Sequence, residues 1–261
     1  MYYNFIKMHG CGNDYIYFDN LNGAEIDVSA LFWLCDRHKG IGSDGIVLIL
    51  PSDAADARMK MFNADGSEGL MCGNAIRCVA EYLYTNGHTG NEMTIETASG
   101  IKRITQAREG MWTVDMGKVT LEPEKEIEIN GTKYMYTKVD VGNPHAVVFV
   151  DDVDNFDVEG IGKQFESHEV FAPHRTNTEF VQIIAKNRLK MRVWERGSGE
   201  TLACGTGACA TAAAAIQKGH ATEATNIKVD LTGGQLTINH TQTRTLMTGE
   251  AKEVFTGKIF L

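Results

Sequence analysis

Two cysteines, each followed directly by glycine, are the residues of this sequence best placed to do chemistry. Cys72 and Cys204 each follow a Gly/Ser-rich stretch and each precede a segment with helical character. A helix start carries unpaired N–H groups and a partial positive charge, which favour a thiolate and can also hold a carboxylate. Each cysteine therefore predicts a reactive sulfur beside an anion-binding site.

The two cysteines occupy the same place in a unit that occurs twice. A displacement of 132 residues puts the alternating basic and apolar segment 58–62 on 190–194 and puts Cys72 on Cys204. In the same register Gly87 falls on Gly219. The period is far too long for a solenoid. It predicts two related domains. We place the first at residues 1–115, with the C-terminal strand joining it, and the second at residues 116–261.

Within each copy the expected order is a strand, a turn, the cysteine and a helix. The helices should cover about 73–86 and 205–218, because glycine just past the last helical residue is a usual end signal. The second helix contains the run 212–215 of four alanines, so we expect it to be buried. One copy alone could be chance, whereas two copies at matched positions indicate that the two cysteines act together in one active site.

The other segments carry weaker signals of secondary structure. Ser29 is expected to cap a helix over 29–38. The remaining expectations are strands at 46–50, 146–150 and 180–184, a helix near 160–168, a charged, turn-rich middle at 109–133, and a C-terminal segment 246–261 that returns to the first domain.

Inversion of a stereocentre by proton transfer needs a base on one face of the carbon and an acid on the other. A thiolate and a thiol supply both, and they exchange roles in the reverse reaction. The helix starts would hold the neighbouring carboxylate and stabilise its growing negative charge. The chemistry requires no cofactor and no metal, so we predict a cofactor-independent epimerase or racemase of amino acids.

Composition narrows the class of protein. The 261 residues are 43% apolar and 23% charged, as in a globular protein, with a net charge of -9. No run of Lys and Arg is present, so neither nucleic acid nor a membrane is predicted as partner. The start of the chain lacks a signal-peptide pattern and no apolar run approaches the roughly 18 residues of a membrane helix, which predicts a cytoplasmic protein. The six cysteines include no C-x-x-C pair and imply no disulfides in a reducing compartment.

Several motifs resemble diaminopimelate epimerase over nearly the whole chain. They are Met8–Asp14, Phe62–Glu68, Met71–Cys78, Gly142–His145, Arg175–Asn177 and Glu195–Gly207. The resemblance implies an α/β (α+β) fold with two pseudo-symmetric domains, each a curled, mostly antiparallel sheet or barrel around a central helix. It further implies an active site in the cleft between the domains, no cofactor, and a homodimer.

The resemblance also assigns roles to residues. Cys72 and Cys204 would be the catalytic pair that converts LL-diaminopimelate to meso-diaminopimelate, assisted by His145 and Glu195. The substrate-binding residues would be Asn13, Asn63, Gly73, Asn74, Asn143, Asn177, Arg196, Gly205 and Thr206. Some family members carry Gln where Gly45 stands here, so one substrate contact of the family is absent from this position.

Two alternative functions stay open at this point. One is a racemase of another amino acid, such as histidine, on the same fold. Arg196 with Asn63 and Asn177 argues instead for a substrate with a second amino-acid end, which favours diaminopimelate. The other is a redox-sensing or binding protein that uses the cysteines as a disulfide switch. Turnover of an amino-acid panel, scored by chiral chromatography, discriminates among the three.

Overall fold

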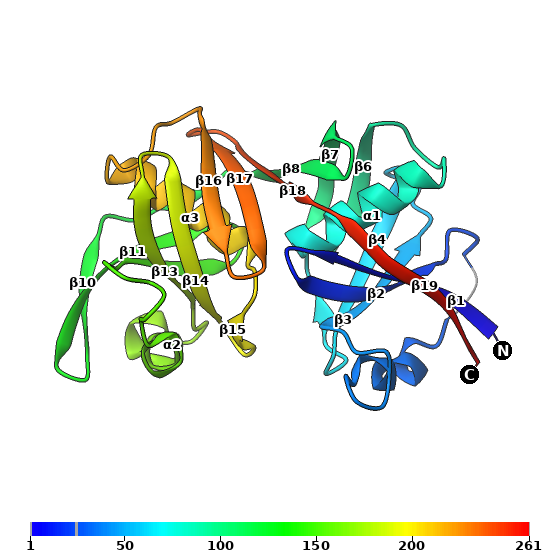
Figure 1. Cartoon of the computed structure of the whole chain (residues 1–261), viewed down its shortest axis with the longest axis horizontal. Helices are drawn as coiled ribbons and strands as arrows, with labels where there is room; N and C mark the ends of the chain where they lie inside the picture. The colour runs from blue at the N-terminus through cyan, green and yellow to red at the C-terminus, as the bar shows by residue number, and fades with distance from the viewer. Residues whose placement is uncertain (1, 24–25, 261) are drawn as a thin grey trace. The chain divides into compact units, whose positions relative to one another are not determined.

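The computed structural model describes residues 2–23 and 26–260. Contacts divide the chain into two compact units. Unit 1 contains the residues up to Val114 and those from Gly249 onward, and unit 2 contains Asp115–Thr248. Figure 1 shows unit 1 in blue to green with a red C-terminal strand, and unit 2 in green to orange. The common ancestry of the two units stays a prediction.

Unit 1 consists of strands with one α-helix and one 3-10 helix. Its strands are β1 (Tyr2–Gly10), β2 (Asn13–Asp19), β3 (Gly45–Leu50), β4 (Ala57–Asn63), β5 (Glu68–Gly69), β6 (Glu92–Thr97), β7 (Gly100–Arg108), β8 (Met111–Gly117) and β19 (Lys252–Phe260). Its described helices are η1 (Val28–Cys35), a 3-10 helix, and α1 (Gly73–Thr85). The chain leaves unit 1 within β8.

Unit 2 has the same kinds of element and, among the described residues, one more α-helix. Its strands are β9 (Thr120–Leu121), β10 (Lys125–Ile129), β11 (Thr132–Asp140), β12 (Pro144–Phe149), β13 (Asn177–Ala185), β14 (Arg188–Glu195), β15 (Gly199–Thr201), β16 (Asn226–Leu231), β17 (Gly234–His240) and β18 (Thr245–Glu250). Its helices are α2 (Val158–Ser167), the 3-10 helix η2 (Glu169–Phe171) and α3 (Gly205–Gln217).

The two units pair their strands in the same order. In unit 1, β1 pairs antiparallel with β2, β2 parallel with β3, β3 antiparallel with β4, and β4 parallel with β6. In unit 2, β11, β12, β13, β14 and β16 repeat this sequence of pairings. Parallel neighbours require a crossover, and the crossovers after β4 and β14 carry α1 and α3. The predicted mixed α/β class, with two similar and mostly antiparallel halves, is confirmed.

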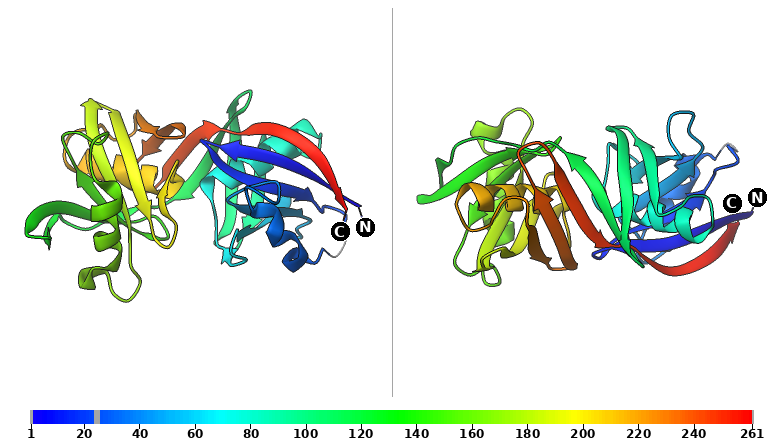
Figure 2. Two further views of the ribbon diagram at one scale, coloured as in Figure 1. Left: turned by 60° about the horizontal axis from the view of Figure 1, so that its bottom comes forward. Right: turned by 90° about the horizontal axis from the view of Figure 1, so that it is seen from above.

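The central helix of unit 2 is enclosed by its sheet. α3 contacts β11, β12, β13, β14, β16 and β17, and Ala212–Ala215 are almost fully buried. Figures 1 and 2 show the strands of unit 2 arranged around α3. Small side chains allow this close packing, so the predicted burial of the alanine run is confirmed. In unit 1, α1 packs against β1, β2 and β19.

Both central helices end as the sequence predicted, to within one residue. Gly87 and Gly219 follow α1 and α3 with φ of 74° and 77°, a left-handed conformation that glycine adopts without strain. The N–H of His88 donates to the carbonyl of Leu83 at 2.9 Å, and the N–H of His220 donates to that of Ala215 at 2.8 Å. These bonds satisfy carbonyls of the last helical turn.

Two predictions of local structure are wrong. The segment 29–38 is not an α-helix capped by Ser29; instead η1 begins at Val28, and the Asp27 carboxylate accepts the Ser29 N–H at 3.0 Å. Asp36 then accepts the N–H groups of His38 and Lys39, which turns the chain away. The segment 109–133 is not mainly turns, because its apolar residues alternate with charged ones and form β8, β9 and β10.

Two further predictions agree with the structure. The helix expected near 160–168 is α2, whose first turn is capped by the Asp157 carboxylate. The C-terminal strand β19 pairs antiparallel with β1, with Tyr2 opposite Phe260. Within the described part of the chain, none of the helices has the length and apolar character needed to cross a membrane.

Candidate functional site

Cys72 and Cys204 have the same backbone environment at the starts of α1 and α3. Each is the N-cap residue, with φ and ψ of -128° and 121° for Cys72 and -121° and 111° for Cys204. The sulfur of Cys72 accepts the N–H of Ala75 at 3.5 Å, and the sulfur of Cys204 accepts the N–H of Gly207 at 3.4 Å. Each thiol therefore lies against the positive end of a 13-residue helix.

In unit 1 the side chains around this helix start are amides. The Cys72 thiol donates to Oδ1 of Asn13 at 3.2 Å, and Nδ2 of Asn74 donates to the same oxygen at 3.3 Å. Cys72 is partly exposed, whereas Asn74 is buried. We call Asn13, Cys72, Gly73 and Asn74 the first half-site; the structure brings these four predicted residues together.

An ionic cluster holds Asn13 from the other side. Nδ2 of Asn13 donates to Asp44 Oδ2 at 2.7 Å. Arg37 bridges Asp14 and Asp44 at 2.7 and 2.8 Å, and Lys7 contacts Asp14. Burial would raise the pKa of Asp14, but hydrogen bonds and charges from Arg37 and Lys7 outweigh it and hold that pKa below its ordinary value. The cluster fixes which face of the Asn13 amide meets Cys72.

A buried guanidinium lies beneath the first half-site. Arg77 is fully buried, and it donates to the Gly73 carbonyl at 2.9 Å and to Oδ1 of Asn74 at 2.9 Å. Its Nε donates to the backbone carbonyl of Glu250 at 3.0 Å. A positive charge so close to the start of α1 adds to the helix dipole and favours a bound carboxylate.

In unit 2 a chain of polar side chains leads to the thiol. Nδ1 of His145 lies 2.6 Å from Glu179 Oε1, and its Nε2 lies 3.0 Å from Asn143 Oδ1. Nδ2 of Asn143 donates to Thr206 Oγ1 at 3.4 Å, and that oxygen lies 3.5 Å from the Cys204 sulfur. We call Asn143, His145, Glu195, Cys204, Gly205 and Thr206 the second half-site.

Glu195 places a carboxylate next to the second thiol. Its Oε1 accepts from the Thr201 hydroxyl at 2.5 Å, and burial raises the pKa of Glu195 although hydrogen bonds from Thr201 and Cys204 oppose the change. Burial also raises the pKa of Cys204 well above its ordinary value, and the charges of Glu195 and Glu179 increase it further. Both effects favour the protonated form of the Cys204 thiol.

The remaining predicted residues, Asn63, Asn177 and Arg196, have hydrogen bonds to backbone groups or to other polar side chains. Oδ1 of Asn177 accepts the backbone N–H of Arg196 at 2.8 Å, and the exposed Arg196 side chain donates to the His174 carbonyl at 2.6 Å. Asn63, at the end of β4, donates to Ser67 Oγ at 2.9 Å. We call Asn63, Asn177 and Arg196 the second group of predicted polar residues; the structure joins Asn177 and Arg196 within unit 2, whereas Asn63 lies in unit 1.

Three residues of these networks were missed in the sequence: Asp44, Arg77 and Glu179. The sequence offered a signal for Glu179, which is a carboxylate directly before the apolar run that begins at Phe180. The structure shows this side chain fully buried. Arg77 had a similar signal inside the apolar helix α1. Asp44 and Glu179 reach partners 31 and 34 residues away, and Arg77 adds the Glu250 carbonyl to its local partners, so the fold is needed to reveal these contacts.

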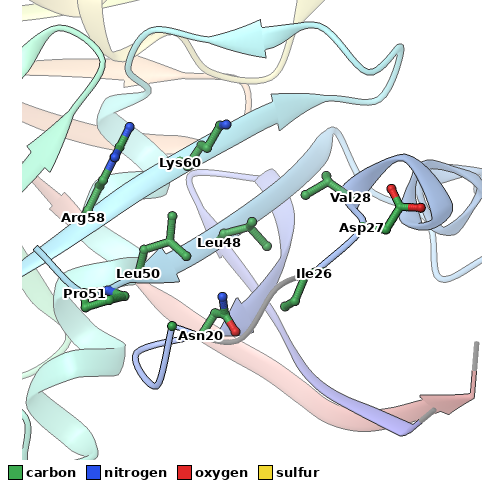
Figure 3. Close-up of a pocket in the computed structure, with 10 residues that line it drawn as sticks. Asn20, Ile26, Asp27, Val28, Leu48, Leu50, Pro51, Arg58 and Lys60 are labelled. Carbon is green, nitrogen blue, oxygen red and sulfur yellow. The ribbon is translucent and has the colours of Figure 1, made fainter.

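A surface pocket in unit 1 does not coincide with these residues. It has a volume of about 550 Å³, and Figure 3 shows Leu48, Leu50, Arg58 and Lys60 along it. Arg58 and Lys60 already face Glu96 and Glu68 at 4.0 and 3.5 Å. Among its described lining residues none is a predicted site residue. In residues 2–23 and 26–260, no three His, Cys, Asp or Glu side chains converge as a metal site would require.

Comparison with known proteins shows the family to which the chain belongs. A family model described as diaminopimelate epimerase matches residues 5–122 and 137–254. The chain belongs to the diaminopimelate epimerase family. A diaminopimelate epimerase of Methanococcus maripaludis is 48% identical over 98% of this chain and 99% of its own length. One of Bacteroides thetaiotaomicron is 48% identical over 98% of this chain and 97% of its own length.

More distant solved structures share the fold of this diaminopimelate epimerase family member. A PhzF-family phenazine biosynthesis protein of Bacillus anthracis has a TM-score of 0.77 at 16% identity, with all of both chains covered. A hydroxyproline epimerase of Agrobacterium vitis, with bound trans-4-hydroxy-L-proline, has a TM-score of 0.75 at 16% identity, covering 99% of this chain and 92% of the other. At these identities the likeness establishes the architecture alone.

Proposed function

We propose that this protein inverts one α-carbon of diaminopimelate, converting the LL form to the meso form without a cofactor. One cysteine, as thiolate, removes the α-hydrogen as a proton, which leaves a carbanion. The other cysteine, as thiol, delivers its proton to the opposite face of the same carbon. After turnover the first sulfur is protonated and the second is a thiolate, so the reverse reaction uses the same groups in exchanged roles.

The matched geometry of the two thiols is the observation that carries this proposal. Each sulfur caps a central helix and accepts the N–H three residues later, at 3.5 Å for Cys72 and 3.4 Å for Cys204. An inversion needs two groups of equal reach on opposite faces of one carbon, and a duplicated thiol supplies such a pair. Family membership supports the choice of diaminopimelate.

The helix starts are proposed to hold the reacting carboxylate. Backbone N–H groups from Gly73 and Asn74, and from Gly205 and Thr206, stabilise negative charge as it moves from the α-carbon into the carboxylate. His145 and Glu195 would assist the Cys204 thiol, and Asn13 and Asn143 would orient the amino-acid end. The ordinary pKa of a cysteine thiol, about 8.5, is close enough to neutral pH for the group to lose and regain a proton during turnover.

The far end of the substrate is proposed to bind the second group of side chains. Arg196 offers a planar fork that matches a carboxylate, and the backbone N–H of Arg196 is fixed by Asn177. Asn63 adds an amide at the end of β4. A substrate with two amino-acid ends accounts for this group, whereas a smaller amino acid leaves it unused.

The test is an incubation of the purified protein in D2O with separate substrates. LL-diaminopimelate, meso-diaminopimelate, L-histidine, L-glutamate and L-proline would each be scored by chiral chromatography and mass spectrometry. We expect inversion and uptake of one deuterium at the α-carbon for the two diaminopimelate forms only. Inversion of histidine without diaminopimelate turnover would replace the proposal with the racemase alternative. If none of these substrates is turned over and the thiols oxidise reversibly, the redox-sensing alternative would replace the proposal.

We further infer a cytoplasmic homodimer. Apolar side chains are exposed on the paired strands β1 and β19, at Tyr2, Val254, Phe255 and Phe260. A row of such residues along an exposed strand is a self-association surface in many proteins. Light scattering coupled to size-exclusion chromatography should give twice the 28.7 kDa mass of the chain; a mass of one chain at micromolar concentration would contradict the dimer.

A further inference from the structure

Glu179 is a buried carboxylate to which the proposed reaction gives no role. It lies on β13, two residues after Asn177, and its side chain and that of His145 are both fully inaccessible to solvent. One of its oxygens, Oε1, lies 2.6 Å from Nδ1 of His145. For the other, Oε2, the described part of the chain provides no hydrogen-bond partner.

The fold makes room for this carboxylate directly under the second half-site. A Cβ atom built on Gly207, in the first turn of α3, would lie 2.6 Å from Glu179 Oε1. Only a residue without a side chain fits at that distance. The absence of a side chain at Gly207 therefore lets Glu179 approach the start of α3, where the helix dipole stabilises its negative charge.

Fold stability does not account for a carboxylate in this place. A buried charge that lacks a partner for one oxygen lowers the free energy of unfolding compared with an apolar group of the same size. The surroundings of Glu179 connect instead to the thiol. The far nitrogen of the His145 ring lies 3.0 Å from Asn143 Oδ1, and Asn143 leads through Thr206 to Cys204.

A carboxylate can only accept hydrogen bonds, and so can the Asn143 amide oxygen that faces Nε2, so each ring nitrogen of His145 donates in this arrangement. An acid beside a histidine is a common device for holding the ring in one orientation. In this protein the acid is on β13 and the histidine is on the neighbouring strand β12, with His145 and Asn177 in register.

We propose that Glu179 is the positioning residue of the second half-site: it takes the Nδ1–H of His145, and so fixes the ring with Nε2 directed at Asn143 and the path to Cys204. Glu179 touches neither substrate nor sulfur in this role. The inference rests on the proposed function for its effect on catalysis, but the protonation of Nδ1 is independent of any substrate.

The first experiment uses the wild-type protein alone. Nitrogen-15 NMR of the histidine-labelled chain, with His145 assigned by its loss in His145→Asn, reports which ring nitrogen carries hydrogen. We expect Nδ1 to be protonated, with a strongly downfield proton from the bond to a carboxylate. A spectrum in which Nδ1 of His145 carries no hydrogen would overturn the proposal whatever any variant does.

The second experiment compares Glu179→Gln with Thr178→Val. Gln keeps the shape, but its amide can donate to Nδ1 as well as accept from it, so the ring is no longer fixed. We expect E179Q to lose the downfield Nδ1 proton and to lower kcat by roughly 10- to 100-fold, the range found when the orienting partner of a functional histidine is removed. T178V alters the adjacent buried residue, whose hydroxyl has no partner in the described chain, and should leave kcat within about 2-fold.

Each outcome of this comparison decides the question. A lower kcat with an unchanged His145 spectrum would mean that Glu179 is merely structural, and an altered spectrum with unchanged kcat would mean that the ring's orientation is irrelevant. Either result overturns the proposal. If E179Q does not fold, Gly207→Ala displaces Glu179 by contact and should change the same resonance. Absence of diaminopimelate turnover by the wild type would refute the proposed function and leave the Nδ1 result standing.

Discussion

The two half-sites have nearly the same backbone and opposite electrostatics. Cys72 and Cys204 cap 13-residue helices with φ values that differ by only 7°. Around Cys72 the structure places two amides above the buried Arg77 guanidinium. Around Cys204 it places Glu195 and Glu179, whose charges raise the pKa of that thiol beyond the effect of burial. The matched helix starts place the two sulfurs alike, and the side chains around them differ.

A two-base inversion gives a reason for this difference. At any moment the reaction needs one thiolate and one thiol, and different environments bias which sulfur carries the proton. Burial beside carboxylates favours the neutral form of Cys204, whereas Cys72 is partly exposed. The comparison therefore predicts that changes at the two cysteines have equal effects on inversion, and that changes around them have unequal effects.

The largest expected effect is the loss of either sulfur. Cys72→Ala and Cys204→Ala should each lower kcat/KM for inversion by at least roughly 10³-fold, because each removes an acid and a base in turn. Any residual uptake of deuterium at the α-carbon should be confined to one epimer, and to the opposite epimer in the other variant. Retention of a tenth of the wild-type rate by either variant would end the equivalence of the two thiols.

Next in size is the loss of the carboxylate beside Cys204. Glu195→Gln should lower kcat by roughly 10- to 100-fold, as removal of an assisting group does. Because the Glu195 charge raises the pKa of Cys204, its removal should lower that pKa, so that alkylation of Cys204 by iodoacetamide begins at lower pH. Peptide mapping across a pH series measures both thiols at once, with Cys72 as the internal control. An equal shift at Cys72 would contradict a local effect.

A smaller effect is expected from the hydroxyl that connects Asn143 to the thiol. Thr206→Val removes a hydrogen bond that holds the pKa of Cys204 down, so alkylation of Cys204 should require higher pH. The loss of one neutral hydrogen bond, about 0.5–1.5 kcal/mol, corresponds to a decrease in kcat/KM of roughly 2- to 10-fold. A shift of the alkylation profile in the same direction as that of E195Q would contradict the assignment.

The smallest effect tests what the two units share. Gly87→Ala and Gly219→Ala each place a side chain on a left-handed residue, with no atom within 4 Å of the new Cβ in either case. Each should lower the free energy of unfolding by about 1–2 kcal/mol, and by similar amounts, with kcat unchanged. Urea unfolding followed by circular dichroism measures this. Unequal losses would show that the matched helix ends differ in their surroundings.

The sequence by itself determined the repeat, the two central helices and the position of a cysteine at the start of each. Each of these depends on residues close together in the chain: a glycine after a helix, a cysteine before it, a strand of alternating character ahead of both. It failed where a local signal was ambiguous. Asp27, and not Ser29, caps the helix that begins at Val28. In the charged segment 109–133, apolar residues that become buried form strands.

Only the tertiary structure decided the charge around each sulfur. Glu179 reaches His145 across 34 residues of sequence, and Asp44 reaches Asn13 across 31. Such contacts depend on which strands become neighbours, and the parallel pairing of β12 with β13 joins segments separated by a crossover. A pKa is set by distance and burial in three dimensions, so a motif predicts the presence of a thiol, whereas the fold determines its ionisation.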